Sequence, residues 1–94
     1  MLYKLEFCQE AWREWKDLDN SIRSQFRKKL NERLACPRIG PDRLNKKPDC
    51  YKIKLRSAGY RLVYEVRDQT VTVIVIAIGK RNRNAVYKAA MQRL

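Results

Sequence analysis

The 94-residue chain contains no histidine. Histidine is a common zinc ligand and the side chain most often used as a general base near neutral pH. The three cysteines, Cys8, Cys36 and Cys50, lie far apart and form no C-x-x-C pair, so their spacing predicts neither a zinc site nor a disulfide framework. We therefore expect three free thiols, buried or partly buried, and no metal or other cofactor.

Long apolar segments are also missing. The longest, residues 71–78, is far too short to cross a bilayer, and the first seven residues are interrupted by Lys4 and Glu6, unlike a signal peptide. All three prolines fall between positions 37 and 48, and no repeat or linker divides the sequence. We expect residues 1–94 to form a single domain that is cytoplasmic and makes no contact with a membrane.

Acidic residues are scarce. The chain has 10 Asp and Glu against 22 Lys and Arg, which gives a formal net charge of +12. The excess is uneven, because residues 1–50 carry a net charge of +4 and residues 51–94 a net charge of +8. Such a distribution predicts a polyanion-binding surface formed mainly by the second half of the chain.

The clearest local pattern lies in residues 51–56. Apolar side chains at the odd positions alternate with Lys52, Lys54 and Arg56, so a strand would place the three cations in one row, about 7 Å apart. Like charges aligned on one sheet face repel. A bound polyanion would relieve this repulsion, and phosphate groups fit that requirement.

The remaining periodicities predict an α+β domain with the element order β-α-α-β-β-β-α. We expect strands at 2–7, 51–56, 61–67 and 70–78, helices at 9–18 and 85–94, a loop at 37–49 and a turn at 57–59. A second helix, with Ile22, Phe26, Leu30 and Leu34 on one stripe, should lie between residues 19–21 and Cys36. The strands should form a small antiparallel sheet, packed by an N-terminal helical hairpin and a short C-terminal helix. The apolar strand 70–78, ended by Gly79, should be central.

Several side chains carry further expectations. Asp19 to Ser21 provide capping groups for the second helix, and Cys36 followed by proline should end it. Trp12 and Trp15 are expected to pack between the helices and the sheet. The last helix should begin at a cap formed by Asn82 or Asn84 and be only weakly anchored.

A second basic corner, residues 79–81, precedes the helix that carries Tyr87 and can approach the lysine strand. The runs DCYKIKLR at 49–56, GYRLVY at 59–64, GKR at 79–81 and VY at 86–87 resemble the RelE family of bacterial toxins. The resemblance covers essentially the whole chain. It departs from the family at Asn45 and Lys46, where a basic residue and glycine are common, and at Asn82, where an acid is common.

This resemblance implies a ribosome-dependent endoribonuclease that cleaves messenger RNA in the ribosomal A site and so inhibits translation. It implies a RelB-like antitoxin as a partner, the 70S ribosome with its 16S rRNA and messenger as targets, and operator DNA bound only through the antitoxin complex. The functional residues carried over are Lys52, Lys54, Arg61, Arg81 and Tyr87. Further basic residues expected to contact RNA or the ribosome are Arg43, Lys46, Lys47, Arg56, Lys80 and Arg83.

Without histidine, RNA cleavage by the 2′-hydroxyl needs an unusual base. Two ammonium groups about 7 Å apart repel by roughly 2 kcal/mol at an effective dielectric near 20, which lowers the pKa of one of them. Lys54 is therefore the candidate base, with Lys52 and Arg61 as phosphate stabilisers. A guanidinium does not readily release a proton, so Arg81 is expected to clamp the transition state. Tyr87 either stacks on a base or places its hydroxyl near the reacting atoms.

Other functions stay open from sequence alone. Arg61 alone could be a solvated strand charge and Tyr87 a core residue. A related ParE-type toxin would act on DNA gyrase without cleaving RNA, although such toxins usually lack this set of residues. A non-catalytic nucleic-acid-binding domain should carry aromatic residues on the basic face, and none stands between Lys52 and Arg56.

Overall fold

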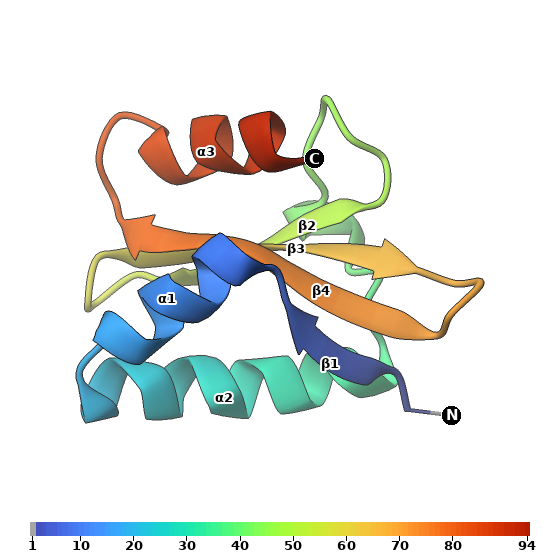
Figure 1. Cartoon of the computed structure of the whole chain (residues 1–94), viewed down its shortest axis with the longest axis horizontal. Helices are drawn as coiled ribbons and strands as arrows, with labels where there is room; N and C mark the ends of the chain where they lie inside the picture. The colour runs from blue at the N-terminus through green and yellow to red at the C-terminus, as the bar shows by residue number, and fades with distance from the viewer. Residues whose placement is uncertain (1) are drawn as a thin grey trace.

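The computed structural model describes residues 2–94 and contains one four-stranded sheet and three α-helices (Figure 1). The elements are β1 (Lys4–Phe7), α1 (Gln9–Asp17), α2 (Asn20–Ala35), the 3₁₀ turn η1 (Gly40–Asp42), β2 (Cys50–Leu55), β3 (Tyr60–Arg67), β4 (Thr72–Lys80) and α3 (Ala85–Arg93). The predicted fold class and element order are confirmed. None of the helices within residues 2–94 has the length and apolar composition of a transmembrane span.

The strand order is β1-β4-β3-β2. The pairs β2–β3 and β3–β4 are antiparallel as predicted, but β1 lies parallel to β4, so the sheet is mixed and the expectation of a purely antiparallel sheet is wrong. Local periodicity identifies strands but carries no information about which strands pair or in which direction. The central place of β4 is confirmed, because every residue from Thr72 to Ile78 is buried.

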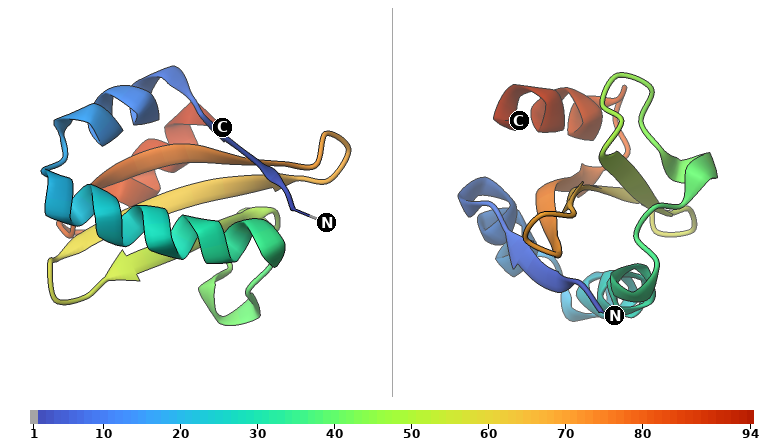
Figure 2. Two further views of the ribbon diagram at one scale, coloured as in Figure 1. Left: turned by 90° about the horizontal axis from the view of Figure 1, so that it is seen from below. Right: turned by 90° about the vertical axis from the view of Figure 1, so that its right-hand side faces the viewer.

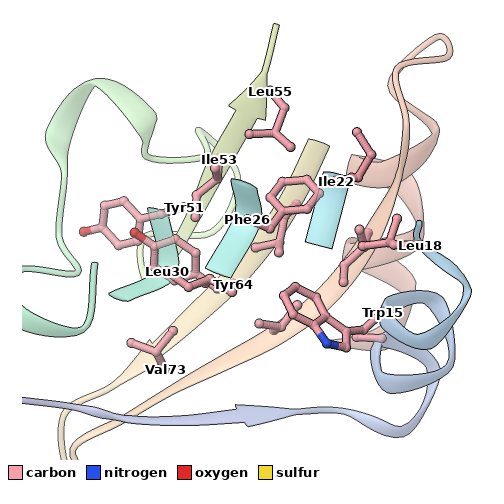
Figure 3. Packing of buried hydrophobic residues seen from close by; sticks show 14 of the residues in the cluster. Trp15, Leu18, Ile22, Phe26, Leu30, Tyr51, Ile53, Leu55, Tyr64 and Val73 are labelled. Atoms are coloured by element: carbon pink, nitrogen blue, oxygen red, sulfur yellow. The ribbon is translucent and has the colours of Figure 1, made fainter. Parts of the chain in front are cut away.

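Helices cover both faces of the sheet. Helices α1 and α2 lie on one face and α3 lies on the other (Figures 1 and 2). The larger core is on the α1 and α2 side, where Trp15, Phe26 and Tyr64 are at most 4% exposed (Figure 3). The smaller core joins Val86 and Ala90 of α3 to the opposite face of the strands. The protein is therefore a three-layer domain whose thinner side carries α3.

Helix α2 follows its sequence signals. The Asp19 carboxylate accepts a hydrogen bond from the backbone N–H of Ile22 at 3.0 Å, which satisfies a free donor in the first turn. Phe26 and Leu30 continue the buried stripe, and the helix ends before Pro37. The predicted cap, stripe and stop are all confirmed.

Two side-chain expectations are wrong. Trp12 is 46% exposed, because it lies on the outer side of α1, where its ring contacts Phe7 edge-on and Lys16 lies over it. Cys36 is exposed at the end of α2, whereas Cys50 is buried in the sheet. The helical spacing that places Trp15 in the core leaves Trp12 only at the edge of the apolar stripe.

A β-bulge in β4 changes the face on which its residues lie. The pairing partners move from Val63 with Ala77 to Tyr64 with Val75, so Ile76 is an extra residue. Before the bulge, odd-numbered residues of β4 pack toward α1 and α2; after it, Gly79 lies on the α3 side, with Val86 Cγ2 3.2 Å from the position of a Cβ. Gly79 also does not end the strand, which continues to Lys80. Its lack of a side chain instead allows α3 to approach closely.

The segment after α2 is fastened to the sheet by Arg33. Its guanidinium contacts the Asp42 carboxylate at 2.6 Å and donates to the Tyr64 hydroxyl at 2.9 Å. The Tyr64 hydroxyl in turn donates to the backbone carbonyl of Pro37 at 2.7 Å. Tyr64 stacks on Tyr51, and Figure 3 shows both hydroxyls pointing out of the apolar cluster. These contacts hold the loop that borders the candidate site.

The expected weak anchoring of the last helix is wrong at its C-terminal end. Arg93 makes two hydrogen bonds to the Glu14 carboxylate of α1. Asn84 is the residue that precedes α3, but it has a left-handed backbone and makes no side-chain capping hydrogen bond. A contact between residues 79 positions apart leaves no local sequence signal.

Candidate functional site

The basic site lies on the α3 face of the sheet. Alternation along β2 places Lys52 and Lys54 on this face, together with the buried Cys50. In the register between β2 and β3, Lys54 stands directly opposite Arg61. The structure therefore brings three of the predicted cations together on two adjacent strands.

Tyr87 of α3 completes this cluster from above the sheet. The Arg61 guanidinium carbon lies 5.1 Å from the centre of the Tyr87 ring, and Arg61 also donates to the side-chain oxygen of Asn84 at 3.4 Å. Burial raises the pKa of Tyr87, with Arg61 acting in the opposite direction, so the phenol stays a hydrogen-bond donor at neutral pH. Arg61 Nε and Tyr87 Oη are both buried without a hydrogen-bond partner. Buried polar groups without partners are rare, and a catalytic role or a bound water or ion is among the reasons for which they occur.

Two hollows adjoin the Arg61 and Tyr87 pair. The larger has a volume of about 500 Å³ and lies between the loop after η1, strand β2 and helix α3. It is lined by Pro41, Arg43, Leu44, Asn45, Lys46, Lys52, Asn84, Tyr87, Lys88 and Met91. The smaller has a volume of about 190 Å³ and is lined by Lys54, Leu55, Arg56, Gly59, Tyr60, Arg61 and Arg81. Neither lining includes an acidic residue, so both hollows suit an anionic ligand.

The pKa of Lys54 lies below the ordinary lysine value. The largest cause is the ammonium group of Lys52, followed by partial burial. The cations Arg61 and Arg56 add to the effect, whereas Asp42 opposes it. The prediction that Lys52 lowers the pKa of its neighbour is confirmed in direction, so Lys54 loses its proton more readily than an ordinary lysine.

The cations of the site are not neutralised by the protein. Within residues 2–94, Lys52, Lys54 and Arg81 have no carboxylate at ion-pair distance. The ion pairs are made by arginines outside the cluster, namely Arg33, Arg38, Arg67 and Arg93. The mutual repulsion of the site cations is therefore available to drive the binding of phosphates.

Arg81 reaches the cluster because of the chain path after β4. Its backbone N–H donates to the carbonyl of Gly59 at 2.7 Å, and its side chain lines the smaller hollow beside Lys54 and Arg61. The bulge at Ile76 turns Gly79, two residues before Arg81, toward the α3 face of the sheet. Each of the five carried-over residues thus lines one of the two hollows, which are linked by the contact between Arg61 and Tyr87.

The other predicted RNA-contacting residues divide into two groups. Arg43 and Lys46 line the larger hollow and Arg56 lines the smaller one. Lys47, Lys80 and Arg83 are exposed but line neither hollow. Contacts of Lys47, Lys80 and Arg83 with RNA or the ribosome would therefore lie around the two hollows and not inside them.

Sequence reasoning missed several residues that shape the site. Asn84, considered only as a helix cap, instead accepts a hydrogen bond from Arg61, and Lys88 and Met91 follow Tyr87 along the face of α3 that lines the larger hollow. Helical spacing from Tyr87 could have identified Met91, four residues further on, but not the adjacent Lys88. In residues 2–94 no three cysteine, aspartate or glutamate side chains come together as a metal-binding cluster.

Comparison with known proteins agrees with this fold. The family model "ParE toxin of type II toxin-antitoxin system, parDE" matches residues 5–85. The chain is 52% identical to the mRNA interferase toxin RelE of Escherichia coli K12 over 94 residues, covering 100% of this chain and 99% of that protein. The mRNA interferase RelE of Shigella flexneri matches with the same identity and coverage.

Solved structures of RelE superpose on this chain over most of its length. An arginine-to-alanine double variant of E. coli RelE in the free state superposes with a TM-score of 0.92 at 50% identity, covering 100% of this chain and 99% of that one. RelE in the intact E. coli RelBE complex superposes with a TM-score of 0.83 at 53% identity, covering 86% of this chain and 99% of that one. The family model and these relatives show a toxin of the type II toxin–antitoxin class. Within that class, the chain belongs to the RelE family.

Proposed function

We propose that this protein is the toxin of a toxin–antitoxin pair and acts as a ribosome-dependent endoribonuclease that cleaves messenger RNA in the A site. The observation that carries the proposal is the pair of buried, unpartnered atoms Arg61 Nε and Tyr87 Oη beside the two lysines Lys52 and Lys54. A phosphate diester and its ribose supply the acceptors and the negative charge that this arrangement lacks. The 52% identity to an mRNA interferase over the whole chain supports the same reaction.

The proposed reaction is attack of the 2′-hydroxyl on the adjacent phosphorus. Lys54, whose pKa is lowered chiefly by Lys52, takes the hydroxyl proton as the new O–P bond forms. The bond from phosphorus to the 5′ oxygen breaks, and that oxygen takes up a proton from water and leaves as a hydroxyl. The products are a 2′,3′-cyclic phosphate and a 5′-hydroxyl end.

The remaining side chains have electrostatic and orienting roles in this proposal. Lys52 and Arg61 stabilise the charge that develops on the phosphate oxygens, and the planar fork of Arg81 holds two of them. Tyr87 offers both a hydroxyl donor and an aromatic face for a splayed base. These groups bind charge well, but the base is still a lysine, so free RNA should be cleaved slowly. A ribosome that holds the messenger in attack geometry would compensate through orientation.

The test of this proposal is cleavage of a defined messenger with and without purified 70S ribosomes. We expect rapid cuts at the A-site codon only when ribosomes are present, because the protein alone does not orient the 2′-hydroxyl. Equal rates with and without ribosomes would refute ribosome dependence. Inhibition of gyrase supercoiling without any RNA cleavage would instead identify the ParE-type alternative.

We also propose an antitoxin partner with an amphipathic, acidic segment. The net charge of +12 provides long-range attraction for such a segment, and relatives have been solved as RelBE complexes. Co-purification with the product of the adjacent gene, followed by a salt series, tests this idea. Affinity that does not fall with rising salt would contradict the electrostatic part.

A further inference from the structure

Helix α3 is fastened at its C-terminal end by one ion pair. Arg93 Nη1 donates to Glu14 Oε1 at 2.8 Å, and Nη2 donates to Oε2 at 3.0 Å. The two side chains are only 19% and 32% exposed. A two-pronged guanidinium–carboxylate contact fixes both the distance and the orientation of its partners, unlike a single contact to a lysine.

The same pair occupies an open backbone edge of the sheet. Strand β1 pairs with β4 only as far as Val75. Beyond it, the carbonyl of Ile76 accepts from Arg93 Nη1 at 2.9 Å, and the N–H of Ile78 donates to Glu14 Oε1 at 3.0 Å. The Glu14–Arg93 pair therefore binds backbone groups that a longer β1 would have bound. Helix α3 is fixed to the sheet and to α1 at one point.

Local backbone and sequence features stabilise the N-terminal end of α3 only weakly. Arg83 and Asn84 have positive φ angles of 45° and 62°, which are unfavourable for residues with a side chain. Asn84 makes no side-chain capping bond, and α3 has only nine residues, too few for a stable isolated helix. The position of the helix must come from packing and from the contacts of Arg93. Tyr87 is six residues before Arg93, or about 9 Å along the helix axis.

We propose that Glu14 and Arg93 are positioning residues for Tyr87: they hold its ring against the Arg61 guanidinium, although neither contacts the site. This proposal rests on the proposed function for its catalytic consequence, and on α3 alone for its structural one. A shift of α3 would remove the 5.1 Å contact between Arg61 and the Tyr87 ring. Small displacements of a reacting group are enough to reduce turnover strongly.

The first experiment needs no RNA and measures amide hydrogen exchange across residues 85–93. Glu14→Gln keeps an acceptor for the Ile78 N–H but removes the charge, and Arg93→Met removes the guanidinium. Hydrogen bonds to charged groups contribute enough that we expect exchange in α3 to rise by about tenfold or more in both variants. Arg67→Met, which breaks the exposed pair with Glu65, should leave α3 unchanged. Unaltered protection of α3 in both Glu14→Gln and Arg93→Met would overturn the proposal.

The second experiment separates positioning from general destabilisation by single-turnover cleavage in a double-mutant cycle. Glu14→Gln should lower the single-turnover rate constant at saturating ribosome by about tenfold, with little change in the ribosome concentration that gives half of that rate. In a Tyr87→Ala background the same substitution should cause almost no further loss, because there is no ring left to position. Equal losses in the two backgrounds would refute a role through Tyr87. If the wild-type protein cleaves no RNA, the proposed function fails, and amide exchange alone decides whether the pair fixes α3.

Discussion

Replacing Arg33 by methionine should loosen the loop that borders the larger hollow. Methionine keeps the aliphatic contacts of the side chain but removes the guanidinium that bonds Asp42 at 2.6 Å and Tyr64 at 2.9 Å. The Tyr64 hydroxyl retains its bond to Pro37, whereas the Asp42 carboxylate, at 30% side-chain exposure, loses its partner and is only partly rehydrated. Since hydrogen bonds to charged groups contribute about 1.5–3 kcal/mol each, and water offsets part of the loss, we expect the free energy of unfolding to fall by about 2–3 kcal/mol.

The assay is equilibrium unfolding in urea followed by tryptophan fluorescence, with Arg67→Met as the matched control. Arg67 also forms a single ion pair, at 2.7 Å to Glu65, but its side chain is 56% exposed. Its loss should cost about 0.5 kcal/mol or less, because water screens an exposed pair. A loss for Arg33→Met that is no larger than the control would show that Arg33 does not hold the loop.

Three further predictions concern the site and the thiols. Lys52→Met removes the largest cause of the lowered pKa of Lys54, so the pKa of Lys54 should rise. The limb of the pH–rate profile on which Lys54 loses its proton should then move to higher pH. A limb that does not move would exclude Lys54 as the base. Arg81→Lys keeps the charge but not the planar fork, and should slow single-turnover cleavage by about 10²-fold with ribosome affinity nearly unchanged, whereas a wild-type rate would make Arg81 a docking charge. Burial raises the pKa of Cys50 to about 11, so iodoacetamide at pH 8 should label exposed Cys36 much faster, and mass spectrometry showing equal labelling would contradict that burial.

The order of elements was predictable because local signals are strong in this chain. The Asp19 cap, the stripe through Phe26 and Leu30 and the stop before Pro37 each depend on residues close in sequence. The same holds for the alternation of Lys52 and Lys54 along β2, which alone places half of the cationic cluster. Short-range periodicity is sufficient for features of this kind.

The features that could not be predicted depend on distant residues. Nothing in β1 indicates that it pairs parallel with β4, and no local pattern reveals the extra residue at Ile76 that moves Gly79 to the α3 side. The contact of Glu14 with Arg93 joins the first and last helices. Each of these is decided by how the layers pack once the strands are in place, so a weakly anchored last helix was the natural but wrong expectation.

The most direct test of the central claim is single-turnover cleavage of messenger in the A site at saturating ribosome, compared for wild type and Lys54→Met. If Lys54 is the base in a cluster built for phosphate, the wild type should give a 2′,3′-cyclic phosphate end. The variant should then be slower by about 10²-fold or more, the size of effect expected for loss of a general base. Ribosome binding, measured in parallel, should be nearly unchanged. Cleavage by Lys54→Met at the wild-type rate, or a wild type that leaves the messenger intact, would contradict the account.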